Sequence, residues 1–436
     1  MENYSIVIFI LFIMIGLSAL ADKIRLPYPV LLITAGIAIG FIPDLPHIEL
    51  NPEIIFLIFL PPLLYDAAFN IDAREFRTHF NTISTLAISL VFISAAAIAV
   101  VAYFLIPGMT WPLAFVLGSI LSATDAVAAI NVTKGLGLSH KTTTILEGES
   151  LVNDASALVA YHFAVAAVTG TAFVIWKASL EFVVLMAGGL LIGFIAAKAL
   201  GYIIRLTKHN SLATISFMLL MPFVAYRVAE EMNVSGVIAV VVLGLAISRY
   251  SHQVLPESVR KESKSFWDVI IFLLNGLIFI LIGLQFPYVV ESMNRSHLLL
   301  YIGYALLIAA VAFLVRLVRV LTQRISLQRG FQYKRGRITE NALLDLRSSL
   351  IISWSGMRGI VSLATAMALP ATLENGEPFP LRSATIFIAT AVVLITIVGQ
   401  GTTLPWLVKW LAKKGPEPEI LAEPEVPRRR PPFRRR

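Results

Sequence analysis

The sequence predicts an all-α polytopic membrane protein with about thirteen transmembrane helices. Of its 436 residues, 57% are hydrophobic and only 14% are charged, whereas soluble domains carry roughly 25% charged residues. Apolar runs of roughly 17 to 25 residues, the length that crosses a bilayer as a helix, follow one another along the chain. The mean hydropathy of +0.81 agrees with this class. The chain has no cysteine, so neither disulfides nor thiolate metal sites are expected.

Thirteen apolar segments are expected to cross the membrane, some of them short or interrupted by glycine and proline. The first follows a start without basic residues and lacks a small-residue cleavage site, so a retained helix is expected rather than a signal peptide. Residues 1–411 are expected to form one transmembrane domain, and residues 412–436 a disordered cytoplasmic tail rich in proline and arginine. The expected spans are 4–20, 27–43, 53–70, 80–106, 111–133, 142–168, 179–204, 211–230, 234–249, 266–286, 297–323, 348–369 and 383–411.

The charge pattern of the loops predicts the orientation. Lysine and arginine gather in alternate loops and in the tail, while the opposite loops carry only Lys177, Arg295 and Arg382. By the positive-inside rule, the N-terminus is expected outside and the C-terminus inside, which an odd number of spans requires. This topology accounts for the net charge of +8, so no nucleic-acid partner is expected. The arginines of the tail are expected to contact anionic membrane lipids.

Thirteen spans also permit an inverted repeat. The first six and the last six are related by an offset of seven, so paired spans run in opposite directions. In this pairing span 111–133, interrupted by Ser122-Ala123-Thr124-Asp125, matches span 348–369, interrupted by Gly356 and Gly359. Two interrupted crossing helices at corresponding positions indicate a transporter site. The alternative is that glycine is simply common in membrane helices.

Two aspartates are expected near the middle of the membrane. At 1.5 Å per residue, Asp154 lies about 18 Å and Asp125 about 14 Å from the inner surface. A carboxyl at this depth costs roughly 2.5–3.5 kcal/mol and marks an ion or proton path. Thr124, Ser150 and Asn153 lie beside the two aspartates. Oxygen ligands of this kind suit a small hard cation, so the sequence predicts a site for one here.

Depth also predicts a buried ion pair. Glu149 and Arg316 each lie about 11 Å from the inner surface and have opposite charges. A buried glutamate needs an opposite charge to stay ionised, so Arg316 is the expected partner. Arg319, nearer the surface, is expected to extend toward the lipid headgroups instead. Glu149 and Asn153 share one helix face, from which Asp154 points about 100° away.

Three further charged residues are candidates with open roles. Arg358, about 15 Å deep in the interrupted span 348–369, is expected to matter, but the sequence names no partner for it. Asp66 could lie on the ion path or be a hydrogen-bonded acid near a helix end. Glu147 is expected to be a solvated residue near the start of its helix.

Four motifs give the chain a family resemblance. Residues 122–128 (SATDAVA) and 147–155 (EGESLVNDA), together with FLPPLLYDAAF at 59–69 and WSGMRG at 354–359, resemble the monovalent cation/proton antiporter family one, the sodium/proton exchangers. The resemblance covers about residues 1–411. It implies exchange of sodium, and also lithium, for protons at Asp154, Asp125, Ser150 and Thr124. It places the protein in the cell membrane, in pH and sodium homeostasis.

The resemblance also implies roles and assembly. Asp125 partly offsets the positive ends of the half-helices in related antiporters. Electrogenic relatives have a second aspartate where this chain has Asn153, which implies electroneutral exchange. A core bundle, about 80–168 and 297–411, is expected to move against a part that forms a homodimer, about 1–70 and 179–286.

Other functions remain as alternatives. A potassium/proton exchanger or a cation channel would use the same ligands, and a membrane sensor or scaffold could keep the fold without moving ions. An enzyme is not expected, because the chain has no Walker A motif, no second half of an intramembrane aspartyl protease, and no histidine in the motif of Ser150. The seven histidines are scattered without metal-ligand spacing. No cofactor is expected.

Overall fold

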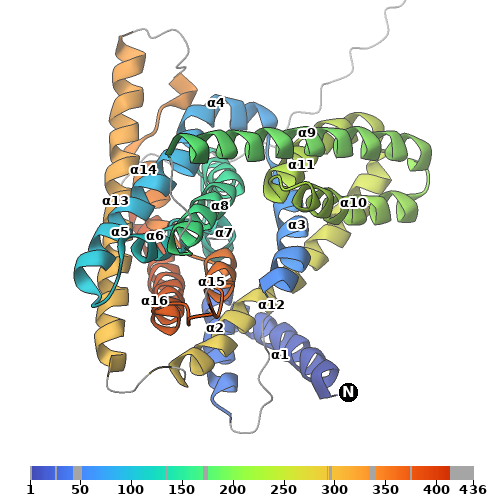
Figure 1. Cartoon of the computed structure of the whole chain (residues 1–436). Helices are drawn as coiled ribbons and strands as arrows, with labels where there is room; N and C mark the ends of the chain where they lie inside the picture. The colour runs from blue at the N-terminus through green and yellow to red at the C-terminus, as the bar shows by residue number, and fades with distance from the viewer. Residues whose placement is uncertain are drawn as a thin grey trace, which may run out of the picture.

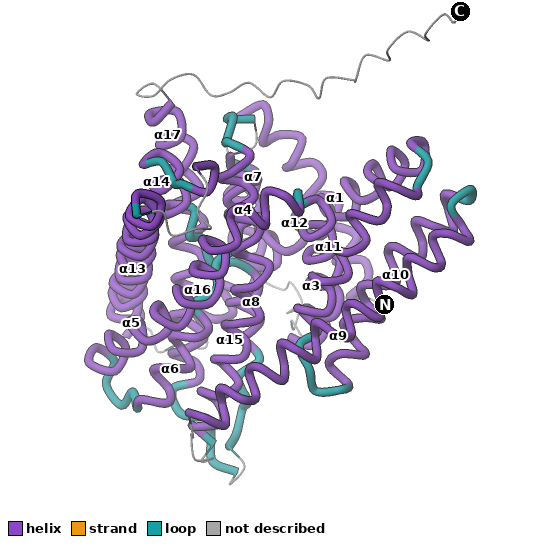
Figure 2. The backbone as a smooth tube through the Cα atoms, turned by 90° about the horizontal axis from the view of Figure 1, so that it is seen from above, coloured by secondary structure: helices purple, strands orange, loops and turns teal. Residues whose placement is uncertain are grey.

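The computed structural model is built from helices and connecting loops (Figures 1 and 2). It describes residues 2–24, 27–42, 52–133, 135–169, 175–291, 293, 297–333, 340–373 and 376–412. In these ranges there is no β-strand, only an isolated bridge between Thr372 and Pro378. The tail expected to be disordered lies, from residue 413 onward, outside the described residues.

The helices follow one another with short connections. Their bounds are α1 (Glu2–Ile24), α2 (Tyr28–Gly40), α3 (Pro52–Asn70), α4 (Ala73–Ser84), a π-helical turn (Thr85–Ser89), α5 (Leu90–Leu105), α6 (Trp111–Ile120), α7 (Ala126–Thr133), α8 (His140–Val168), α9 (Ile175–Thr207), α10 (Ser211–Glu231), α11 (Gly236–Val254), α12 (Glu257–Glu291), α13 (Leu298–Gln332), a 3-10 turn (Glu340–Ala342), α14 (Leu346–Trp354), α15 (Ile360–Met367), α16 (Arg382–Ile395), a second π-helical turn (Thr396–Gln400) and α17 (Gly401–Ala412).

Helical segments lie at each range where the sequence predicts a span, but several ends differ. Helix α12 begins nine residues before the expected 266, and α13 runs nine residues past the expected 323. At 35 residues each, both helices are about 52 Å long, which exceeds the roughly 30 Å of the hydrocarbon core. Hydropathy indicates only the part of a helix that lies in lipid, so the sequence did not predict the charged extensions of α12 and α13.

Three large hydrophobic clusters hold most of the buried apolar side chains. The first contains residues of α5, α6, α13 and α16. The second contains residues of α3, α9, α10 and α11. The third contains residues of α1, α2, α12, α15 and α17. Helix α13 stands along one side of the molecule and α10 lies on the opposite side, while α9 runs across the molecule from near α5 to α10 (Figures 1 and 2). Helices α3, α8 and α12 lie between these two sides and enclose the centre.

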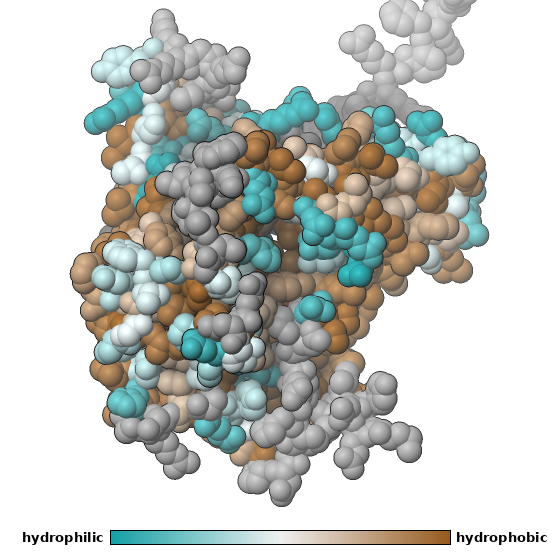
Figure 3. Space-filling model, viewed as in Figure 1, coloured by the Kyte–Doolittle hydropathy of each residue, from teal (hydrophilic) through white to brown (hydrophobic). Residues whose placement is uncertain are grey.

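The lateral surface is apolar. Large hydrophobic side chains such as Phe104, Leu191 and Leu314 are more than half exposed, and hydrophobic residues cover both flanks of the view in Figure 3. Within the described residues, eight helices are long and apolar enough to cross a bilayer, and four shorter apolar helices add to them. An outer surface of this kind needs lipid around it, so the chain is a multi-span membrane protein.

Candidate ion-binding site

Two interrupted helices meet at the centre of the protein. The gap between α6 and α7 covers residues 121–125, and the gap between α14 and α15 covers residues 355–359. The two gaps are joined directly, because the backbone N–H of Asp125 donates to the carbonyl oxygen of Met357 at 2.7 Å. The interruptions predicted in both spans are therefore present and lie against each other.

Asp125 lies at the N-terminal ends of two half-helices. Its Oδ1 accepts hydrogen bonds from the backbone N–H groups of Val127 (2.8 Å) and Ala128 (3.3 Å), in the first turn of α7. The same carboxylate touches Gly359, the residue that precedes α15. Helix N-termini carry partial positive charge, so a carboxylate at this position would offset part of it.

Arg358 lies at the opposite, C-terminal ends. Its side chain is 1% exposed, and Nε donates to the carbonyl oxygen of Leu121, directly after α6, at 3.0 Å. A terminal nitrogen donates to the carbonyl oxygen of Gly356, after α14, at 2.6 Å. Carbonyl groups at helix ends carry partial negative charge. The partners that the sequence could not name for Arg358 are therefore backbone carbonyls.

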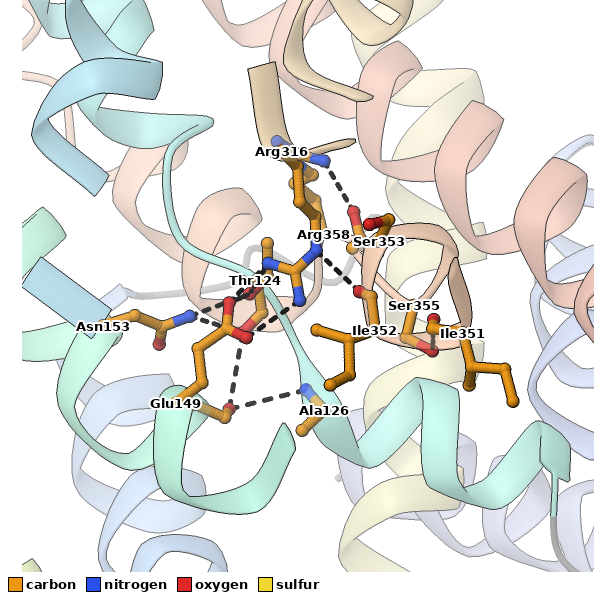
Figure 4. A network of polar contacts seen from close by, with 12 residues as sticks. Thr124, Ala126, Glu149, Asn153, Arg316, Ile351, Ile352, Ser353, Ser355 and Arg358 are labelled. Carbon is orange, nitrogen blue, oxygen red and sulfur yellow. Dashed lines mark hydrogen bonds and ion pairs between the residues drawn. The ribbon is translucent and has the colours of Figure 1, made fainter. Parts of the chain in front are cut away.

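Glu149 and Arg316 form a buried ion pair (Figure 4). Each side chain is 2% exposed, and the guanidinium binds both carboxylate oxygens, one of them at 2.8 Å. The Nε of Arg316 donates to the carbonyl oxygen of Ile352 at 2.9 Å. The pair therefore ties α8 and α13 to α14, beside the second helix break. Arg319, which was expected to extend toward the lipid headgroups, is partly buried and donates to the Ser89 hydroxyl at 3.2 Å.

Thr124 and Asn153 extend this network (Figure 4). The Thr124 hydroxyl donates to Glu149 at 2.9 Å and accepts from the Asn153 amide at 2.9 Å. The same amide also donates to the Thr124 carbonyl oxygen at 2.9 Å. Thr124 was predicted as a hydroxyl ligand of the cation, but its hydroxyl is engaged by Glu149 and Asn153. The Ser150 hydroxyl donates to the Thr124 carbonyl oxygen at 3.4 Å.

Asp154 points into a cavity next to the helix breaks. The residue is 8% exposed, and in the part of the chain that the structure describes its carboxylate accepts no hydrogen bond. The cavity has a volume of about 210 Å³, room for several water molecules. Asp125, Ser150 and Thr124 also line it. A buried carboxylate without a donor needs a proton or a cation, so the surroundings of Asp154 suit ion binding.

The same cavity contains two more carboxyls, Asp66 and Glu147. Glu147, expected to be a solvated residue at the start of its helix, is half-buried and lines the cavity. That prediction was wrong because the exposure of Glu147 depends on α3, whose position beside α8 no local pattern reveals. Asp66 and Asn70 also line a larger cavity of about 860 Å³.

Comparison with known proteins identifies the family of the chain. The family model described as "sodium/hydrogen exchanger, transmembrane" matches residues 7–410. A sodium, potassium, lithium and rubidium/H(+) antiporter from Bacillus pumilus is 35% identical over 397 residues, which are 88% of this chain and 58% of the relative. The low-affinity Na(+)/H(+) antiporter NhaS1 from Synechocystis is 32% identical over 98% of this chain and 77% of its own length. The chain thus spans less than two thirds of the Bacillus protein.

The fold also matches a solved structure. The sodium proton antiporter MjNhaP1 from Methanocaldococcus jannaschii, solved at pH 8, superposes with a TM-score of 0.70. The match covers 94% of this chain and 99% of the other at 20% identity, so it shows a shared fold. Because the family model matches nearly the whole chain, this protein belongs to the sodium/hydrogen exchanger family.

Proposed function

We propose that the protein is a secondary antiporter that exchanges a monovalent cation, sodium and also lithium, for protons. One observation carries the proposal: the Asp154 carboxylate is buried, faces a cavity and accepts no hydrogen bond from the described residues. The names of the relatives from Bacillus pumilus and Synechocystis, which describe cation/proton antiporters, support the same reaction.

Proton and cation compete for Asp154. Removing a carboxylate from water is unfavourable, and either a bound proton or a partly dehydrated cation relieves this penalty. A cation would be held by the carboxylates of Asp154 and Asp125 and by the Ser150 hydroxyl, because hard cations prefer such oxygens. Thr124 would help to position these ligands through its hydrogen bonds with Glu149 and Asn153. Binding of one ion therefore excludes the other, which is the condition for exchange.

The wider architecture follows as part of the proposal. The paired breaks in α6–α7 and α14–α15 support an inverted repeat of thirteen spans, with the N-terminus outside and the C-terminus inside. Residues 80–168 and 297–411 would move as a core against residues 1–70 and 179–286. The exposed apolar side chains of α9 support the second part as the place where two copies meet in a homodimer.

Reconstituted liposomes test the function. Proton movement is followed with a pH-sensitive dye while sodium, lithium, potassium and rubidium chloride are added in turn. We expect sodium and lithium to drive proton movement, and the Asp154→Asn variant to abolish it without loss of folded protein. Glu231→Gln, an exposed carboxyl on α10, is the matched control with full activity.

Each other outcome has a defined meaning. Proton movement with potassium alone would replace the proposal by potassium/proton exchange. Cation flux without coupled proton movement would indicate a channel. A folded wild-type protein that moves no ions would support a sensor or scaffold, and wild-type flux in Asp154→Asn would reject the mechanism.

A further inference from the structure

Ser362, on α15, has a buried hydroxyl that no hydrogen bond satisfies. The residue is 1% exposed, and its Oγ has no partner among the residues that the structure describes. Buried polar groups in proteins are nearly always hydrogen-bonded, because an unpaired one loses its contacts with water and gains nothing in return. The hydroxyl of Ser362 therefore needs a water molecule or a bound ion.

The break before α15 explains why this hydroxyl is unpaired. A serine or threonine inside a helix can donate to the carbonyl oxygen four residues earlier, and Thr365 on the same helix does so to Val361 at 2.6 Å. For Ser362 the corresponding residue is Arg358. Arg358 precedes Gly359, whose backbone is extended (φ −125°, ψ −153°), so its carbonyl group is not part of the helix. The break that forms the ion site thus also deprives Ser362 of its local acceptor.

Ser362 lines the same cavity as Asp154. On α15 it comes three residues, about one turn, after Gly359, which touches Asp125. On α8, Asp154 comes four residues, about one turn, after Ser150, which donates to the other break. Ser362 and Asp154 each lie about one helical turn from the paired breaks, and the cavity of about 210 Å³ that they share brings them together.

The set of cation ligands has a place for a second hydroxyl. Hard cations prefer several oxygen ligands, but the Thr124 hydroxyl, which the sequence predicted as one of them, is engaged by Glu149 and Asn153. The Ser362 hydroxyl has two unused lone pairs to offer a cation. A proton on Asp154 needs no such ligand, because it forms a covalent bond to one carboxylate oxygen.

We propose that the Ser362 hydroxyl is a ligand of the cation bound at Asp154 and raises the affinity of this site for sodium and lithium relative to the proton. This inference rests on the proposed exchange function. Both residues belong to the proposed core, 80–168 and 297–411, so the hydroxyl stays with the ion when the core moves. It therefore contributes to cation affinity at both faces of the membrane. Asn275, a side chain on α12 that also lines the cavity, lies outside this core and would not follow the ion.

Sided membrane vesicles test the ligand. Exchange is measured against sodium and lithium concentration in everted and in right-side-out vesicles. We expect Ser362→Ala to raise the KM about three- to tenfold at both faces, since one oxygen ligand of the ion is lost, with the maximal rate kept. Ser362→Thr keeps the hydroxyl and should retain most of the affinity. Ser156→Ala, which removes a buried hydroxyl that donates to the Val152 carbonyl oxygen at 3.1 Å outside the cavity lining, is the matched control.

Competition with protons supplies a readout that a merely structural role would not change. At constant sodium concentration, a more weakly bound cation is displaced from Asp154 at a lower proton concentration. The acidic limb of the activity profile should therefore move to higher pH in Ser362→Ala, by about one pH unit for a tenfold change in KM.

Thermal unfolding of the purified protein measures binding without transport. Sodium that binds only the folded protein raises its unfolding temperature, and choline chloride is the reference salt. Ser362→Ala should need about three to ten times more sodium for the same rise. If Ser362→Ala does not fold, Ser362→Cys takes its place, because a soft sulfur is a poor ligand for a hard cation.

Three results would overturn the role of Ser362: an unchanged KM, a KM that changes at only one face, or a fall in maximal rate at constant KM. Failure of this role differs from failure of the exchange function. If wild-type vesicles exchange sodium for protons and Asp154→Asn vesicles do not, while Ser362→Ala keeps its KM, only the role of Ser362 is rejected. If wild-type vesicles exchange nothing, the exchange function fails, and the sodium-dependent unfolding temperature still decides whether Ser362 binds the cation.

Discussion

The ion pair between Glu149 and Arg316 should contribute a large, mutually dependent part of the stability. Glu149→Gln leaves the Arg316 guanidinium buried with bonds to two neutral oxygens, the carbonyl oxygen of Ile352 at 2.9 Å and the Thr124 hydroxyl at 3.5 Å. Arg316→Gln leaves the Glu149 carboxylate buried with only the Thr124 hydroxyl. Removing one partner of a buried pair costs about 3 to 5 kcal/mol, because the other charge stays out of water.

The double variant distinguishes this reasoning from ordinary loss of packing. With both charges gone, no unbalanced charge remains, so the loss should be close to that of one single variant rather than their sum. The expected coupling free energy is therefore about 3 to 5 kcal/mol. Tryptophan fluorescence during unfolding in detergent suits the measurement, since the chain has six tryptophans and no cysteine for a thiol dye.

A second double-mutant cycle, between Glu149 and Arg319, supplies the control. Arg319 is on the same helix, α13, but donates to Ser89 rather than to Glu149. Losses from Glu149→Gln and Arg319→Gln should therefore add within about 0.5 kcal/mol. Additivity in the Glu149–Arg316 cycle would refute the pairing, and strong coupling in the Arg319 cycle would identify Arg319 as the partner.

Three more predictions concern the helix breaks and a helix start. Gly359→Ala should cut exchange sharply and cost about 1 to 3 kcal/mol, because its Cβ would lie 2.6 Å from the Cγ of Asp125; Gly303→Ala, with open space around it, should leave the flux assay unchanged. Arg358→Gln should lower the unfolding free energy by about 3 kcal/mol through two charge-assisted bonds, and Arg358→Lys should not restore it, since an ammonium lacks the planar fork. Asp345→Ala should cost about 1 kcal/mol at pH 7, because Asp345 accepts from the N–H of Ser348 at the start of α14. Burial alone would raise the pKa of Asp345, but the bonds from Ser348 and the charge of Lys141 outweigh it and lower the pKa. The stability that Asp345 contributes is thus fully present at pH values above its pKa in the unfolded chain, about 3.9, and should fade as the pH falls below that pKa. The unfolding curves of wild type and variant should therefore converge at this low pH.

Depth arithmetic predicted much of the centre from the sequence. The rise of a helix is constant and an unpaired charge in lipid is expensive, so equal depth and opposite sign were enough to join Glu149 to Arg316. The same arithmetic placed Asp125 and Asp154 in one layer, and both line one cavity. The two breaks were visible as polar residues and glycines inside apolar segments.

Contacts with the backbone, and contacts between helices that are distant in the chain, could not be predicted from the sequence. Arg358 binds carbonyl groups, which every residue has, so no pattern could identify them. The Thr124 hydroxyl turns toward Glu149 because of a rotamer that only the packed network selects. Glu147 lines the cavity because α3 lies opposite α8. These features depend on tertiary packing rather than on depth or period.

We propose that exchange at Asp154 is one-for-one, without net charge movement. The Asn153 amide donates to Thr124 and cannot titrate. Asp125 accepts two backbone N–H bonds in the first turn of α7, and in this proposal it is a fixed ligand that does not exchange a proton. Asp154 is then the exchangeable carboxyl, and the site carries the same net charge with either ion. The sodium-driven proton flux should therefore not depend on an imposed membrane potential.

Liposomes with different potassium diffusion potentials test this directly, with proton leaks measured in empty liposomes. A wild-type rate that rises or reverses with potential would mean that a second charge crosses the membrane. Asp125 or Asp66 would then be the second proton carrier, since both line the cavity with Asp154.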